Sequence, residues 1–287
     1  MYSVEFDLKH EIKRVFGIQE KDIQEFTNER GSNYVYSFIA KGEKYVIKKL
    51  NETSIFDWKN EKTAYNVLKP LNITDELINY ENGIRITRYI NNSENLTFSA
   101  GDQIEALNKI RMIHKSGVFI EHKYDIVENI TKYMNLCRDK NTKSFNELKS
   151  YRDEINAIQT ALNKLNIQPV LCHGDACLSS NFLRVHNKSE FIKIIDWEQA
   201  GMADPLLDIA IAAIHQGLEN IDPVWSLHFY LERIPTGQEY LRLFSFLALD
   251  SFLWTAWYIS IEDQEDYEFY LNYAIKYGKL ALTFMDF

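Results

Sequence analysis

The stretch LCHGDACLSSNFL, residues 171–183, is followed closely by FIKIIDWEQAGMADPLLDIA, residues 191–210. The first places Asp175 just after a short apolar run that reads as a strand, and Asn181 is the sixth residue after Asp175. The second begins as a β-branched run and has Asp196 at its end. Because a hairpin returns two strand ends to the same edge, we expect these polar side chains to lie close together.

The residue types in these segments suit a metal and a proton. A carboxylate that accepts a proton from an alcohol must be held rigidly on an exposed loop, and Asp175 is placed for that role. Asn181 offers a neutral oxygen and Asp196 an anionic one, both suited to Mg²⁺, and Glu198 is a candidate ligand for a second Mg²⁺. One base and two metal-facing oxygens are the set that Mg²⁺-assisted phosphoryl transfer requires.

The order HGD, Asn, IDWE and DIA resembles the active-site signature of the aminoglycoside phosphotransferase and choline kinase superfamily. The resemblance implies an α+β, protein-kinase-like fold of two lobes. It also implies that Asp175 is the catalytic base and that Asn181 and Asp196 bind Mg²⁺. His173 and Asp208, the latter in the DIA segment, would support the catalytic loop.

The loop between the base and the asparagine departs from the family pattern. Members of the family usually have the asparagine as the fifth residue after the base, whereas Asn181 is the sixth after Asp175. Ser180 therefore occupies the usual ligand position. Either the loop bulges or Ser180 contributes a ligand, and we favour a bulge that keeps Asn181 as the ligand.

The rest of the sequence predicts the helices and strands that carry this site. Apolar spacing predicts a helix that ends at Gly17, and β-rich runs at 34–40 and 44–50 predict a hairpin. A helix within 54–70 begins at Ser54 or Asp57, and a second hairpin turns at Asn82-Gly83. Residues 1–90 are thus expected to form a small N-terminal lobe with an antiparallel sheet. Residues 91–287 are expected to form a large helical lobe with one β island, PVLC, FLRV and FIKIID.

A nucleotide clamp is expected in the small lobe. The segment ERGSNY, residues 29–34, resembles the phosphate-facing loop of choline kinases, although Arg30 replaces its first glycine. Gly31 allows close backbone approach, Ser32 offers a hydroxyl and Asn33 offers an amide. Taken alone, the segment reads equally well as an ordinary β-turn.

The strand YVIKKL resembles the kinase Val-Ala-Ile-Lys motif, so Lys48 is expected to reach the phosphates. Alternation places Lys49 on the opposite face. Glu61 lies in the following helix, where kinases keep the carboxylate that pairs with that lysine.

The acceptor site is expected near the C-terminal end of the sequence. Trp254 and Trp257 lie three apart on one predicted helix, and Phe269 and Tyr273 lie four apart on the next. Such stripes are usually core, but FLWTAW and EFYLNYA resemble the choline kinase segments that line the choline pocket. Two such helices side by side would form an aromatic box for a quaternary ammonium.

Two positions of that pocket depart from choline kinases. Gln199 replaces a pocket tyrosine, and His215 replaces an acidic residue seven positions beyond the DIA aspartate. A neutral His215 does not attract a cation by charge, and a protonated one repels it. Glu198 and Asp250 are the candidates to compensate.

The composition excludes some classes of function. The net charge of −9, from 41 acidic and 32 basic residues, argues against a nucleic-acid surface and mildly favours a cationic ligand. Three cysteines lack metal spacing, and the first residues lack the apolar core of a signal peptide. The longest apolar stretch is interrupted by Asp250. We expect a cytoplasmic protein without membrane insertion, and the sequence does not indicate its oligomeric state.

Together the patterns predict a kinase that transfers the γ-phosphate of ATP, with Mg²⁺, to the hydroxyl of a small cationic amino alcohol. Choline or ethanolamine is the first choice. An aminoglycoside or another small molecule is the alternative acceptor, because HGDACL itself resembles aminoglycoside phosphotransferases. A catalytically silent nucleotide-binding scaffold is the rival of a different class. A structural helical adaptor would leave the paired carboxylates unexplained.

Overall fold

The computed structural model describes residues 2–29, 33–51, 54–97, 99–138, 142–186, 191–215, 222–262 and 264–285. The chain forms two compact units. The first comprises Met1–Glu94 and Leu183–Glu198, and the second comprises Asn95–Phe182 and Gln199–Phe287. The segment that carries Asp196 therefore belongs with the N-terminal residues, although it lies far along the chain.

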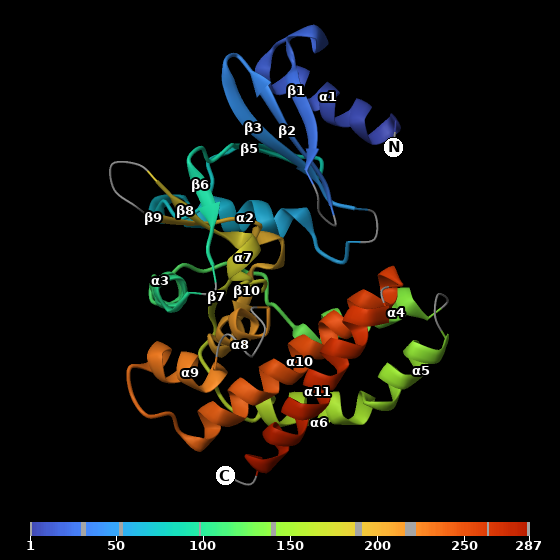
Figure 1. The fold of residues 1–287 in the computed structure, drawn as a ribbon, viewed down its shortest axis with the longest axis vertical. Coiled ribbons are helices and arrows are strands. Elements are labelled where there is room, and N and C mark those ends of the chain that lie inside the picture. Colours follow the sequence, from blue (N-terminus) through green and yellow to red (C-terminus); the bar gives the residue numbers. More distant parts are fainter. Residues whose placement is uncertain are drawn as a thin grey trace. The chain divides into compact units, whose positions relative to one another are not determined.

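The first unit is built on a five-stranded antiparallel sheet of order β1-β2-β3-β5-β4 (Figure 1). Its strands are β1 (Gln24–Glu29), β2 (Tyr34–Ala40), β3 (Glu43–Lys49), β4 (Leu77–Glu81) and β5 (Ile84–Arg88). Both predicted hairpins are confirmed, and Lys41, Gly42, Asn82 and Gly83 all have positive φ. This is the geometry of the tight turns that suit the right-handed twist of strands.

Helix α1 (Tyr2–Phe16) covers one face of this sheet (Figure 1). Its residues Leu8, Ile12 and Phe16 pack against a core cluster that includes Phe38, Ile47 and Ile86. The helix ends as predicted, with Gly17 at a φ of +61° and its N–H donating to the Lys13 carbonyl at 2.9 Å.

The other elements of the first unit carry the candidate site. Helix α2 (Trp58–Leu68) begins at Asp57, whose carboxylate accepts the Lys59 N–H at 2.9 Å. A three-stranded sheet of order β6-β8-β9 brings together β6 (Ser93–Asn95), β8 (Phe182–Val185) and β9 (Phe191–Ile194). Short 3₁₀ turns occur at Glu20–Asp22, Lys69–Leu71 and Trp197–Gln199.

The second unit is mainly helical. Its helices are α3 (Ala100–His114), α4 (Ile126–Cys137), α5 (Thr142–Ser150), α6 (Arg152–Asn163), α7 (Leu178–Asn181), α8 (Leu206–Ile214), α9 (Pro223–Leu231), α10 (Gly237–Ile261) and α11 (Gln264–Thr283). Strands β7 (Val170–Cys172) and β10 (Gly201–Ala203) pair antiparallel. All nine residues of α8 are buried, and it packs against α10.

Helices α10 and α11 lie side by side along much of their length (Figure 1). Among the described helices, α10 alone is long and apolar enough to cross a membrane, but 78% of its most apolar window is buried within the structure. Burial of that kind is a property of a core helix, and the apolar composition of α10 is explained by its packing.

Candidate active site

Lys48 forms the centre of the charged cluster in the first unit. Its side chain is 3% exposed, and its ammonium contacts the carboxylates of both Asp196 and Glu198. Lys49, the next residue on β3, points to the α1 face and meets Asp7 at 3.0 Å, as strand alternation requires. The structure thus brings Lys48 together with two carboxylates that lie 148 and 150 positions further along the sequence.

The backbone around Asp196 holds its side chain in place. Asp196 has a φ of +67°, an uncommon conformation for a residue with a side chain. Next to it, Trp197 is fully buried and its indole N–H donates to the Ile194 carbonyl at 2.9 Å. Strain of this kind persists only where neighbouring contacts hold it, and it commonly marks functional positions.

Asn33 connects the loop before β2 to the same cluster. Its side-chain amide nitrogen donates to Glu198 at 3.0 Å, and its side-chain oxygen accepts the Asn51 N–H at 3.0 Å. Gly31 and Ser32, the other two loop residues expected to contact ATP, lie outside the described residues.

The carboxylate of Glu61 bonds to residues that the sequence did not single out. It is fully buried and accepts hydrogen bonds from Arg85 and Tyr80. Arg85 lies directly opposite Lys48 in the β3–β5 register, so two cations compete for the carboxylates on this face. Arg85 pairs with Glu61, while Lys48 contacts Asp196 and Glu198.

The electrostatics of the cluster follow from its burial. Burial lowers the pKa of Lys48, but the carboxylates of Asp196, Glu198 and Glu61 outweigh it, and the pKa lies above its usual value. Burial raises the pKa of Glu198, and Lys48 offsets this only in part. Three carboxylates thus face two cations, an excess of negative charge that suits an added cation.

The second unit holds Asp175 and Asn181 together. The Asn181 amide donates to the carbonyl of Asp175 at 2.8 Å and to its carboxylate at 3.0 Å. The segment between them contains the short helix α7, at the end of which the Asn181 N–H donates to the Cys177 carbonyl at 2.9 Å. Asn181 is buried beside Asp175, whereas Ser180 is exposed.

Asp208 fixes the backbone just before Asp175. Its two carboxylate oxygens accept the N–H groups of His173 at 2.8 Å and Gly174 at 3.0 Å. The Asp208 carboxylate also lies 3.1 Å from Nε2 of His114, and Nδ1 of His114 contacts the Tyr230 hydroxyl at 2.8 Å. Burial alone would raise the pKa of Asp208, but these partners lower it, so the carboxylate remains charged.

Gly174 is required by the local geometry. Its φ is +78°, and a Cβ there would run into the backbone carbonyl of Gln199. Gln199 is buried, and its side-chain oxygen accepts from the Tyr124 hydroxyl at 3.3 Å. The family resemblance implies that choline kinases have a tyrosine at this position. In this chain, Gln199 packs against the loop at Gly174.

The aromatic residues of α10 and α11 form one connected cluster. Trp254 lies 5.1 Å from Trp257 and 6.1 Å from Tyr270, measured between ring centroids. Phe269 and Tyr273 contact each other at 4.7 Å, but Phe269 is 41% exposed. Tyr270, rather than Phe269, is the α11 residue that packs against Trp254.

His215 and Asp250 lie at the buried end of this cluster. The His215 ring is 4.7 Å from Trp254, and its Nε2 lies 3.3 Å from Oδ2 of Asp250. Burial lowers the pKa of His215, but the carboxylates of Asp250 and Asp175 outweigh it and raise the pKa. Burial also raises the pKa of Asp250, although His215 opposes it. Of the two candidates to compensate for His215, the structure places Asp250 beside it.

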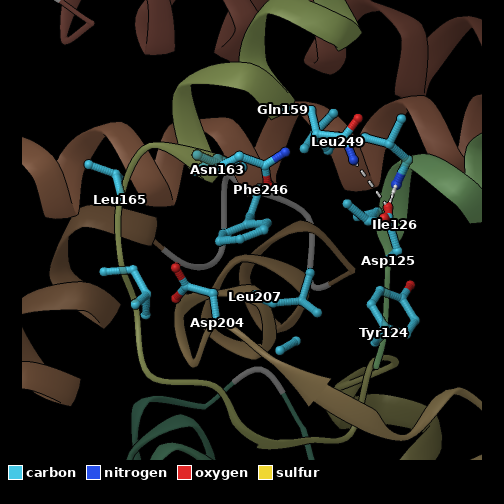
Figure 2. A pocket seen from close by; sticks show the side chains of 14 residues that line it. Tyr124, Asp125, Ile126, Gln159, Asn163, Leu165, Asp204, Leu207, Phe246 and Leu249 are labelled. Atoms are coloured by element: carbon cyan, nitrogen blue, oxygen red, sulfur yellow. Dashed lines mark hydrogen bonds between the residues drawn. The ribbon is translucent and has the colours of Figure 1, made fainter. Parts of the chain in front are cut away.

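A separate cavity of about 190 Å³ lies in the second unit and contains none of the predicted site residues (Figure 2). Phe246 and Leu207 lie at its apolar side. Its two acidic residues already have partners, because Asp125 accepts from Gln159 at 3.4 Å and Asp204 pairs with Arg242. We assign no ligand to this cavity.

Comparison with known proteins identifies the family. The model of the choline/ethanolamine kinase family matches residues 40–226, about two thirds of the chain. The chain belongs to the choline/ethanolamine kinase family. The LicA protein of Haemophilus influenzae is 26% identical over 179 residues, which are 59% of this chain and 65% of LicA. The match therefore spans slightly less than two thirds of that relative.

Solved structures agree on the fold of this family member, which is protein-kinase-like. The choline kinase LicA from Streptococcus pneumoniae superposes with a TM-score of 0.73 at 18% identity, covering 99% of both chains. The spectinomycin phosphotransferase APH(9)-Ia, solved with ADP and spectinomycin, gives a TM-score of 0.56 at 15% identity, covering 96% of this chain and 97% of its own. Both predictions, of the family and of the fold class, are confirmed.

In the first unit, the carboxylates of Asp196 and Glu198 fit Mg²⁺, because they present anionic oxygens to one cation, Lys48. In the second unit, Asn181 offers a neutral side-chain oxygen, since its two hydrogen bonds to Asp175 are donated by its amide nitrogen. Oxygen ligands of this type are the ones that Mg²⁺ prefers. Bound Mg²⁺ would shield phosphate charge during transfer.

Proposed function

We propose that the chain is an ATP-dependent kinase that phosphorylates the hydroxyl of choline, ethanolamine or a closely related amino alcohol. The observation that carries this proposal is the clamp by Asp208 on the His173 and Gly174 N–H groups, with Asn181 bonded to Asp175 beyond it. A base held in this way is positioned for an alcohol proton before the substrate arrives. Family membership supports the same chemistry.

The roles follow the chemistry of each side chain. Asp175 orients the acceptor hydroxyl and takes its proton. Lys48 contributes positive charge to the triphosphate, and Asn33, with Gly31 and Ser32, lies in the loop proposed to contact it. Asn181, Asp196 and Glu198 are the proposed Mg²⁺ ligands. We place the protein in the cytoplasm.

The aminoglycoside alternative concerns the acceptor and leaves the chemistry unchanged. It is supported by the similarity in fold to the spectinomycin phosphotransferase. A silent scaffold remains the rival of another class. It is opposed by the combination of Lys48, Asp196 and Asp175, because an inactive scaffold has no need of a rigidly held base.

An acceptor panel tests the proposal. Phosphorylated product is measured with ATP and Mg²⁺ against choline, ethanolamine, thiamine and aminoglycosides. Asp175→Asn should abolish turnover while ATP binding, measured by calorimetry, stays within about twofold, because a general base contributes about 10²–10⁴ in rate and little to nucleotide affinity. The exposed Asp153→Asn on α6 is the matched control and should match the wild type.

Each outcome of the panel assigns the protein to one class. Turnover only with aminoglycosides would show that the acceptor is an aminoglycoside and not an amino alcohol. ATP binding without turnover on any acceptor would favour the scaffold. Substantial activity in Asp175→Asn would remove Asp175 as the base.

A further inference from the structure

Arg85 is a buried cation on β5 that contacts two other segments of the first unit. Its guanidinium donates to the carboxylate of Glu61 on α2 and lies 5.3 Å from the ring centre of Tyr65, one turn further along that helix. It also lies 3.7 Å from the Asp196 carboxylate, just after β9. A buried charge is costly unless it is paired, so these contacts hold the guanidinium in one place.

Glu61 has two cations within reach. Residues directly opposite each other in an antiparallel strand pair project from the same face, with their Cβ atoms about 5 Å apart. Lys48 and Arg85 form such a pair across β3 and β5. Glu61 is fully buried, and a buried carboxylate that loses its partner is strongly unfavourable. If Arg85 were absent, Lys48 would be the cation directly across the strand pair that could neutralise Glu61.

We propose that Arg85 is a positioning residue that holds Glu61 and thereby keeps the Lys48 ammonium available for the triphosphate. This inference rests on the proposed function in taking Lys48 as a phosphate contact. In the kinase motif, the carboxylate of the helix pairs with the lysine of the strand. In this chain Arg85 takes that carboxylate, and Lys48 contacts Asp196 and Glu198 instead.

Two tyrosines hold Glu61 and Arg85 in this arrangement. The Tyr80 hydroxyl donates to the Glu61 oxygen that Arg85 does not contact. Tyr65, whose ring lies beside the guanidinium, donates its own hydroxyl to Asp75 at 2.7 Å. Because each member of the pair has a second, anchored neighbour, the pair has one preferred geometry, and Glu61 is directed to Arg85.

Nucleotide affinity tests the proposal without any acceptor. Calorimetry at low temperature gives Kd for ATP with Mg²⁺ in the wild type, in Arg85→Met, and in Arg85→Met combined with Glu61→Gln. We expect Arg85→Met to raise Kd about tenfold, the factor of one charge-assisted hydrogen bond, because Glu61 then draws Lys48 from the phosphates. The double variant removes that competing charge, and its Kd should return to within about threefold of the wild type.

The same variants separate positioning from structural support. Arg85→Met should also lose stability in urea, but a merely structural role would change stability and leave Kd unchanged. An unchanged Kd in Arg85→Met would therefore overturn the proposal. A double variant as weak as Arg85→Met would overturn it as well, because the defect would then not come from Glu61. In steady-state kinetics, KM for ATP should rise more than KM for the acceptor.

Two milder substitutions keep the test decisive if Arg85→Met does not fold. Arg85→Gln offers Glu61 an amide donor without charge, and we expect Kd for ATP to rise in the same direction. An unchanged Kd in that variant would contradict the proposal. Arg85→Lys keeps the charge and should stay within about threefold of the wild type. A loss in Arg85→Lys as large as in Arg85→Gln would show that charge is not the cause.

Arg14 provides a matched control on the other face of the sheet. It donates to Glu11 of α1, a buried carboxylate that has a second donor in Asn79 at 2.8 Å. Arg14→Met thus removes a cation from a buried carboxylate in the same unit, away from Lys48. It should lower stability and leave Kd for ATP within about twofold of the wild type.

Failure of the proposed function would give a different result. Absence of turnover with every acceptor would overturn the proposed acceptors, while the Kd values would still decide the role of Arg85. A wild-type protein that does not bind ATP would overturn both the proposed function and this inference.

Discussion

The replacement of Asp208 by alanine is predicted to damage stability and catalysis together. Asp208 is 2% exposed, and its carboxylate accepts the N–H groups of His173 and Gly174 while lying 3.1 Å from Nε2 of His114. The substitution leaves two buried backbone donors without their acceptor. At about 1–3 kcal/mol for each donor, the free energy of unfolding should fall by about 2–6 kcal/mol. A domain with a stability of about 5–15 kcal/mol should remain folded at low temperature.

The catalytic effect has the same cause. Because Asp175 follows Gly174 directly, the loss of the clamp frees the backbone that orients its carboxylate. We expect kcat to fall at least about tenfold, since small displacements of a catalytic group cost rate steeply, with KM for ATP nearly unchanged. Asp208→Asn retains one carbonyl oxygen and should lose less stability than Asp208→Ala.

Urea denaturation at neutral pH and steady-state kinetics measure the two effects. The reasoning is refuted if Asp208→Ala loses less than about 1 kcal/mol, the lower limit for a single unsatisfied buried donor. A stability loss of the expected size with wild-type kcat would contradict the second step, because it would show that the loop keeps its geometry without the clamp. Asp153→Ala, at an exposed position, controls for loss of an aspartate as such.

Three further predictions concern single residues. Gly174→Ala should lower kcat strongly and cost more than about 1 kcal/mol of stability in urea denaturation, because the left-handed backbone and the Gln199 carbonyl both oppose a Cβ. Trp254→Ala should raise KM for the acceptor far more than KM for ATP in steady-state kinetics. Equal changes in the two KM values would show that Trp254 only packs in the core. Hydrogen bonding from Arg233 lowers the pKa of Glu239 from 4.5 to about 2, so its stabilisation is complete above pH 4.5 and is lost as the pH falls toward 2. Between pH 5 and 3, the free energy of unfolding of Glu239→Gln should fall by about 1 kcal/mol less than that of the wild type, after allowance for solvent screening. Denaturation at the two pH values measures this difference.

Local patterns predicted most of the fold. The helix that ends at Gly17, the Asp57 cap and the turns at Lys41-Gly42 and Asn82-Gly83 all depend on a few neighbouring residues. The motif order predicted the family for a similar reason, because spacing along one short segment carries the information. The short strands β6 and β10 were not predicted, since three residues give no measurable periodicity.

Partners across the structure were harder to predict. Kinase motifs suggested Lys48 as the partner of Glu61, but the β3–β5 register sets Arg85 opposite Lys48. Arg85 then hydrogen-bonds to Glu61, with Tyr80 as a second donor. Register is a property of strand pairing, and a sequence pattern gives no means of choosing between two cations that share one face of a sheet.

The aromatic cluster shows a related limit. Four-residue spacing correctly implied that Phe269 and Tyr273 contact each other, at 4.7 Å. It did not determine which face of α11 turns toward α10, because that rotation is set by packing. The face that packs against Trp254 carries Tyr270, one residue further along the helix. Tyr258, one helical turn after Trp254, was missed for the same reason.

His215 stands where the family resemblance implies an acidic residue, and the structure shows that the charge near this position also depends on other helices. A comparison by position records a lost negative charge and implies a weaker site for cations. In the structure the carboxylate of Asp250, one helical turn before Trp254, lies beside His215, so negative charge is present from another helix. Burial lowers the pKa of His215, but this carboxylate opposes it and raises the pKa, so the exchange places an imidazole and a carboxylate side by side at the buried end of the aromatic cluster. The charge near a cationic acceptor is therefore set by this pair of residues from two helices, and not by the exchanged position alone.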